Sequence, residues 1–142
     1  METTPYLRQV QYYETDQMAI VHHSNYIRWF EEARLDYMMQ HGVSCKALEE
    51  RGILIPVVDI NCKYLVSAHY ADTVLIHVFL TQYTGVRMTY RYEVVFRDTG
   101  VLAATGTSTH CFLDTNRRPF SLKKKEKELH TLLCSMVEPD AK

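Results

Sequence analysis

A long segment with helical spacing lies near the start of the chain, and most of the segments that follow it alternate with a period of two. Its apolar side chains recur at three- and four-residue intervals, at Tyr26, Trp29, Phe30, Ala33 and Tyr37. This spacing is typical of one apolar helix face. We predict that the helix begins near Asn25, with an N-cap oxygen from Ser24 or Asn25. Gly42 stands where a glycine commonly follows a helix C-terminus.

Strand patterns fill most of the remaining chain. Residues 6–13 can form a first strand, and segments with strand patterns follow the helix at residues 53–65, 73–83, 86–96 and 101–113. In 86–96 every second residue is apolar, namely Val86, Met88, Tyr90, Tyr92, Val94 and Phe96. Turn residues at 84–85 and 98–100 join successive strands, and such short connections predict an antiparallel sheet.

Three further residues refine the predicted fold. Pro56 suggests an edge strand or a bulge, and Gly106 suggests a bulge or a close approach of another group. Ser121 can cap a final helix that runs through Cys134. We therefore predict one α+β domain over residues 1–142, in which a long helix packs against an antiparallel sheet and a short helix ends the chain.

Composition excludes several classes of protein. A net charge of −1 at pH 7 provides no general attraction for nucleic acid or membranes. No apolar run approaches the ~20 residues of a membrane span, and the first residues lack the pattern of a secretory signal. The four cysteines are scattered without a C-x-x-C pair. We expect them to be reduced, in a cytoplasmic protein.

The loop before the helix carries the residues with the clearest chemical potential. Asp16 lies a few residues upstream of a helix N-terminus, whose unpaired N–H groups carry about half a positive charge. Such a terminus can bind a developing oxyanion, while a nearby carboxylate attacks an ester or activates water. A thioester suits this site, because its leaving thiol has a pKa of about 8.5 and needs little help from an acid.

Structural explanations for these residues are also available. An Asp before a helix is more often a turn or capping residue. His22 and His23 would point in different directions in an extended loop, and two adjacent histidines make a poor metal site without a third spaced ligand. We therefore expect no bound metal.

The stretch "YYETDQMAIVHHSNYIRWFEEAR" resembles the signature loop of the hotdog-fold acyl-CoA thioesterases, in the hydroxybenzoyl-CoA thioesterase-like family. The matching positions are Asp16, His23 seven residues later, Ile20-Val21 and Asn25-Tyr26. The segments "ADTVLIHV" and "TGTSTHCFLDTNRRPFSL" are also similar to family segments. The family usually has Gly where this chain has Ala19. We expect an ordinary backbone conformation there, with Met18 helping to shape the acyl pocket.

The resemblance implies a hotdog fold, in which the sheet wraps around the long helix. It also implies an acyl-CoA substrate, no separate cofactor, and a homodimer or homotetramer with active sites at subunit boundaries. By this analogy Asp16 is the base or nucleophile, the N–H of His23 binds the thioester oxygen, and Tyr13 and Asn25 support the loop. The Tyr-rich strand 86–96 is a candidate interface element, because sheet faces and edges left open favour association.

Basic residues near the C-terminus are candidates for binding the phosphates of coenzyme A. Arg117, Arg118 and Lys123, followed by Lys124 and Lys125, lie in and after the loop that leaves the last strand. A solvated helix face is the alternative explanation. Two other functions stay open: a non-catalytic acyl-CoA-binding protein, and a hotdog dehydratase, whose His-Phe-Pro-Gly motif this chain lacks.

Overall fold

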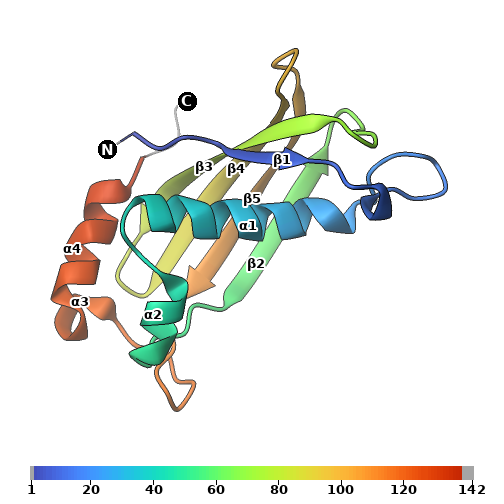
Figure 1. Cartoon of the computed structure of the whole chain (residues 1–142). Coiled ribbons are helices and arrows are strands. Elements are labelled where there is room, and N and C mark those ends of the chain that lie inside the picture. Colours follow the sequence, from blue (N-terminus) through green and yellow to red (C-terminus); the bar gives the residue numbers. More distant parts are fainter. Residues whose placement is uncertain (1, 139–142) are drawn as a thin grey trace.

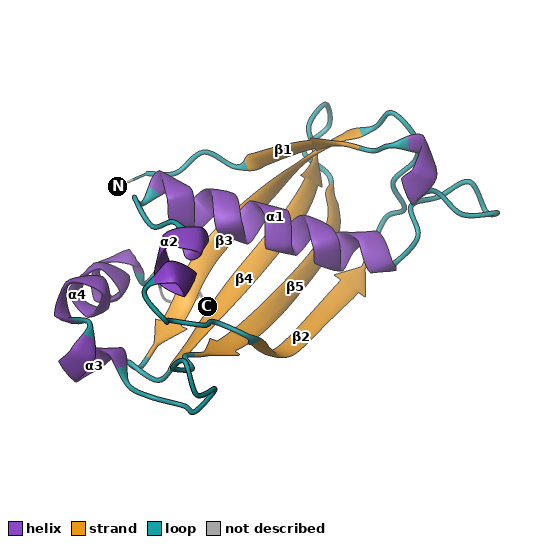
Figure 2. Ribbon diagram, turned by 60° about the horizontal axis from the view of Figure 1, so that its bottom comes forward, coloured by secondary structure: helices purple, strands orange, loops and turns teal. Residues whose placement is uncertain are grey.

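The sheet and the long helix define the architecture of residues 2–138, which the computed structural model describes (Figures 1 and 2). Five antiparallel strands form one sheet in the order β1-β3-β4-β5-β2. The strands are β1 (Tyr6–Gln9), β2 (Val57–Tyr64), β3 (Thr73–Tyr83), β4 (Arg87–Phe96) and β5 (Leu102–Cys111). Helix α1 (Ser24–Gln40) lies across one face of this sheet. The predicted antiparallel hotdog architecture is confirmed.

Smaller elements surround this unit. A 3₁₀ turn (Tyr12–Glu14) precedes α1, and α2 (Cys45–Glu50) follows it. The predicted C-terminal helix consists of two pieces, α3 (Leu122–Lys125) and α4 (Lys127–Met136), because the backbone of Glu126 leaves the helical region. Ser121 caps α3 as predicted, since its side chain accepts the Lys123 N–H at 3.2 Å. Helix α2 had no counterpart in the sequence predictions.

The core lies between α1 and the sheet. The five apolar residues of the predicted helix face are all buried. The rings of Phe30 and Tyr92 stack with centroids 4.4 Å apart, and burial of a side chain such as Phe30 stabilises the fold by roughly 1.5–3 kcal/mol. The predicted close approach at Gly106 is confirmed, because a Cβ atom there would overlap the Phe30 ring and the backbone oxygen of Asn61.

The Tyr-rich strand β4 is a central strand of the sheet, and its role in an interface between subunits stays a prediction. It pairs with β3 and β5 on its two sides, and Tyr90 and Tyr92 are fully buried under α1. The aromatic face of β4 therefore packs in the hydrophobic core of its own subunit. The two edge strands of the sheet are β1 and β2. The register of β2 shifts between Val57 and Asp59, which agrees with the edge strand or bulge predicted from Pro56.

Two predicted boundaries at the N-terminal side were wrong. The first strand ends at Gln9 rather than at residue 13, because the chain turns into the 3₁₀ turn, where the Glu14 carboxylate accepts the Gln11 N–H at 2.8 Å. Neither predicted residue is the N-cap of α1: His23 occupies that position without a side-chain capping bond. Gly42 follows the helix with φ of 82°, as a C-terminal glycine should.

Candidate active site

The loop that leads into α1 folds back on itself. A backbone bridge joins Thr15 to Val21, the Asp16 N–H donates to the Ile20 carbonyl at 2.9 Å, and the Asp16 side chain accepts the Met18 N–H at 2.8 Å. Reversing the chain over so few residues places Ala19 at φ of 62°. The expectation of an ordinary conformation at Ala19 was therefore wrong, and a non-glycine residue there costs roughly 1 kcal/mol.

The two histidines lie side by side. Their ring centroids are 4.1 Å apart and the rings are nearly parallel. The expectation that they would point apart assumed an extended backbone, but His23 has helical φ and ψ of −56° and −28°. Ser24 Oγ lies 2.8 Å from His22 Nδ1, and this contact holds the first ring of the pair.

A small cavity of about 160 Å³ brings Asp16 and His23 together. Most of its remaining walls are apolar or aromatic, and they include Met18, Ile20, Val21, Tyr26, Leu65 and Val66. Asp16 is half-buried and His23 is exposed, so the cavity is open to solvent on the histidine side. The predicted base and the predicted oxyanion position therefore share one site.

The end of strand β2 closes this site from the side. The Tyr64 hydroxyl donates to the His23 carbonyl at 2.9 Å, and the Tyr64 ring meets Tyr26 edge-on at 5.1 Å. Removal of the ring from solvent raises the pKa of Tyr64 to about 12, so its hydroxyl keeps its proton at neutral pH. The sequence predictions missed Tyr64, because it lies 41 residues after His23 and no local pattern links the two.

The N-terminus of α1 lies next to the loop at the right of Figure 1, and His23 at this terminus lines the cavity. Within residues 2–138 no acceptor is found for the backbone N–H of His23. A helix N-terminus of this kind presents unpaired donors and a partial positive charge. The arrangement can polarise a carbonyl oxygen while holding a carboxylate beside it.

The two predicted supporting residues differ in position. Asn25 donates from Nδ2 to the carbonyls of Glu14 at 2.9 Å and His22 at 3.3 Å, so it links the two ends of the loop. Tyr13 is 70% exposed and does not belong to the described residues that line the cavity.

The predicted phosphate-binding residues lie at the far end of the sheet within one chain. Arg117 and Arg118 follow Leu113, which pairs with Leu54 just before β2 begins, whereas the other end of β2 reaches the cavity. Eight residues of strand separate these ends, roughly 25 Å at about 3.3 Å per residue. Lys123 is the second residue of α3, which follows the same loop. One chain therefore does not bring these basic groups to Asp16.

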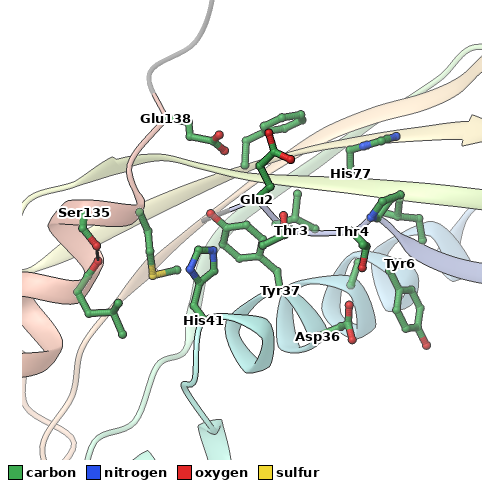
Figure 3. A pocket seen from close by; sticks show the side chains of 17 residues that line it. Glu2, Thr3, Thr4, Tyr6, Asp36, Tyr37, His41, His77, Ser135 and Glu138 are labelled. Carbon is green, nitrogen blue, oxygen red and sulfur yellow. Dashed lines mark hydrogen bonds between the residues drawn. The ribbon is translucent and has the colours of Figure 1, made fainter.

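A larger cavity of about 430 Å³ lies toward the other end of α1 (Figure 3). It is bounded by the N-terminal segment, α1, β3 and α4, with Tyr37, His41 and Glu138 around it. The described residues that line it include none of the predicted site residues. The smaller cavity, rather than this one, combines a carboxylate with a helix N-terminus.

The described part of the chain has neither a metal-binding cluster nor a membrane-spanning helix. Residues 2–138 contain no group of three His, Cys, Asp or Glu side chains placed to hold a metal ion. In the same range, no helix has the length and apolar character needed to cross a membrane.

Comparisons with known proteins bear on the family and the fold of this chain. The sequence profile of the Thioesterase-like superfamily matches residues 10–132. YneP of Bacillus subtilis (strain 168), provisionally named an acyl-CoA thioesterase, is 36% identical over 124 residues, which cover 87% of this chain and 89% of YneP. The 1,4-dihydroxy-2-naphthoyl-CoA hydrolase of Prochlorococcus marinus (strain MIT 9515) is 25% identical over 118 residues, which cover 78% of this chain and 77% of that protein.

A solved structure is also similar over most of its length. The DHNA-CoA thioesterase from Staphylococcus aureus has a TM-score of 0.88 and 32% sequence identity, and the match covers 93% of this chain and 89% of that one. The family profile and the shared fold both span most of the molecule. This chain therefore belongs to the thioesterase-like superfamily, a family of hotdog-fold thioester hydrolases.

Proposed function

We propose that this enzyme hydrolyses small or medium acyl- or aroyl-CoA thioesters to the free acid and coenzyme A. The observation that carries the proposal is the shared cavity of Asp16 and the His23 end of α1. YneP, provisionally named an acyl-CoA thioesterase, and the naphthoyl-CoA hydrolase support a CoA thioester as the substrate class. The cavity of about 160 Å³, with its aromatic and aliphatic walls, favours an acyl group of modest size.

The proposed mechanism uses two groups that line the cavity, the Asp16 carboxylate and the backbone N–H of His23. The thioester oxygen accepts the His23 N–H, and negative charge that develops on this oxygen is stabilised by the helix N-terminus. Asp16 either attacks the carbonyl carbon or removes a proton from an attacking water. The C–S bond then breaks, and the leaving thiolate is stable because its conjugate acid has a pKa of about 8.5. In the direct route the product of this step is an Asp16–acyl anhydride, which water hydrolyses to the free acid and the Asp16 carboxylate. We propose that the reaction needs no metal ion or separate cofactor.

A second copy of the chain would complete the site for coenzyme A. Strand β2 is an edge strand with exposed apolar side chains, namely Val57, Val58 and Tyr64. If two copies pair antiparallel along β2, the start of this strand in one copy lies beside its end in the other. Arg117, Arg118 and Lys123 of one copy would then approach the cavity of its neighbour and could bind the phosphates of coenzyme A. We therefore propose a homodimer, or a homotetramer built from it.

The cysteines support a reducing compartment. Cys45, Cys62, Cys111 and Cys134 are all free, and free thiols are usual in cytosolic proteins. We accordingly propose a cytoplasmic location.

Hydrolysis of a panel of acyl- and aroyl-CoAs, followed by release of the thiol, tests the proposed function. We expect turnover of at least one member with a short aliphatic or a single aromatic acyl group. Tight binding of acyl-CoAs by the folded protein without any thiol release would contradict the proposal and favour a non-catalytic binding protein.

A further inference from the structure

Glu14 is a buried carboxylate that stands two residues before Asp16 and outside the cavity. Its side chain is only 4% exposed, and it is absent from the described residues that line the cavity. We propose that Glu14 is a positioning residue, which fixes the Asp16 loop against the N-terminal half of α1. The inference rests on the proposed thioesterase function for its kinetic consequences.

Three donors hold the Glu14 carboxylate, and they come from three different elements. Oε2 accepts Trp29 Nε1–H of α1 at 2.8 Å and Arg8 Nη2–H of β1 at 2.9 Å. Oε1 accepts the Gln11 N–H at the start of the 3₁₀ turn at 2.8 Å. Burying a carboxylate lowers the stability of the fold unless the group is paired and hydrogen-bonded in this way. The side chain therefore locks the residue in one position relative to both β1 and α1.

The backbone of the same residue closes the loop. The Glu14 carbonyl accepts the His22 N–H at 2.8 Å and Asn25 Nδ2–H at 2.9 Å. The chain between Glu14 and His22 contains Asp16 and reverses through the bridge of Thr15 with Val21. One anchored residue thus holds both ends of the loop that carries the carboxylate of the site.

This geometry sets the position of the Asp16 carboxylate relative to the oxyanion donor. Trp29 belongs to the same helix whose N-terminus faces the cavity, so the bond from Trp29 to Glu14 couples the loop to that helix. A displacement of about 1 Å at a reacting group can cost roughly 10²-fold in rate. Glu14 would act through Asp16 and would exchange no proton with the substrate.

Glu14→Gln tests the inference, and Glu32→Gln is its matched control. Glu32 accepts from the same Arg8, at 3.0 Å, but it is 38% exposed and its bonds are to Arg8 and Tyr6 rather than to the loop. We expect Glu14→Gln to lower kcat about 10²-fold with KM nearly unchanged, the pattern of an interaction that matters in the transition state. Glu32→Gln should keep the kcat of the wild type. Equal losses in the two variants would overturn the inference.

A loss of stability must be separated from a loss of positioning. Leu133→Ala removes a buried side chain of α4, which is 1% exposed, and should destabilise the fold by about 2–5 kcal/mol. At a temperature where all variants are folded, Leu133→Ala should retain kcat. If it loses as much activity as Glu14→Gln, stability alone explains the effect and the inference fails. If Glu14→Gln does not fold, Trp29→Phe removes the N–H donor and leaves a smaller aromatic ring in the core, and it should show the same fall in kcat, beyond any loss seen in Leu133→Ala.

Amide hydrogen exchange gives a readout that is independent of activity. The His22 N–H donates to the backbone carbonyl of residue 14, which glutamine keeps. Its exchange should accelerate in Glu14→Gln because the carboxylate no longer anchors that carbonyl, whereas the amide of Ala33 within α1 should exchange at the wild-type rate. Unchanged exchange at His22 would overturn the positioning role even if the protein hydrolysed no thioester. A wild-type protein without turnover, but with accelerated His22 exchange in the variant, would refute the proposed function and leave the loop anchor supported.

Discussion

The carboxylate of Asp16 has one oxygen bonded to the Met18 N–H, and it faces the cavity with His23. General base catalysis typically contributes 10²–10⁴-fold, so Asp16→Asn should lower kcat by roughly that factor while acyl-CoA binding is largely kept. His23→Ala should lower kcat by a smaller factor than Asp16→Asn, because the backbone N–H of residue 23 is still present after the substitution. Steady-state thiol release and ligand titration measure both variants.

Two results would change the roles of these residues. Full activity in folded Asp16→Asn would return Asp16 to a turn residue, and an equally deep loss in His23→Ala would assign chemistry to the imidazole ring. A single turnover in ¹⁸O-labelled water tests direct attack by Asp16. Water that opens the Asp16–acyl anhydride at the Asp16 carbon leaves ¹⁸O in the Asp16 carboxylate, whereas general-base catalysis places ¹⁸O only in the released acid.

Strands β4 and β5 share a buried polar chain. Ser108 Oγ bonds to the Tyr92 hydroxyl on β4 and lies 2.8 Å from His110 Nε2 on β5. Burial, aided by the charge of Arg34, lowers the pKa of His110 from 6.5 to about 4. Protonation is therefore easier in the unfolded chain than in the folded one. Stability should be fully present above pH 6.5 and should fall as the pH drops from 6.5 to about 4.

The His110 effect can be measured by denaturant unfolding of wild type and His110→Gln at several pH values. Within this window, one group changes the free energy of unfolding by up to about 1.4 kcal/mol per pH unit. The stability difference between the two proteins should therefore shrink on acidification. A difference that stays constant between pH 7 and pH 4.5 would show that His110 has no such role.

The two edges of the sheet differ in what they expose to a second copy. Val58 on β2 is 46% exposed and Leu7 on β1 is 53% exposed, so a lysine at either place is tolerated within the subunit. In the proposed antiparallel pairing, a lysine at position 58 near the start of β2 would lie close to Lys63 near the end of β2 in the other copy. Like charges that face each other across paired strands are destabilising. Val58→Lys should therefore produce monomers by light scattering and lose most thioester turnover. Leu7→Lys should keep the assembly and activity of wild type.

This comparison also tests the shared site for coenzyme A. The basic loop of one chain is roughly 25 Å from its own cavity along β2, by strand geometry, so a monomer would have phosphate-binding groups and catalytic groups far apart. An active wild-type monomer, or a Val58→Lys dimer with full activity, would contradict pairing along β2.

Local patterns alone predicted much of the fold. The helix face, the strand 73–83, the close approach at Gly106 and the cap at Ser121 depend on spacing and residue type within a few positions, and the structure confirmed each of them. The Asp16 loop was identified by its resemblance to a family signature. Its presence beside a helix N-terminus follows from adjacency in the chain.

The tertiary structure decided everything that depends on strand order. The order β1-β3-β4-β5-β2 brings Tyr64 to His23 and buries Tyr90 and Tyr92 in the core of their own subunit. The folded loop also imposes the positive φ of Ala19. Periodicity shows which face of an element is apolar, but it does not show which element lies beside it. Contacts between distant segments, such as Glu14 with Arg8 and Trp29, depend on that packing and so appear only in the folded chain.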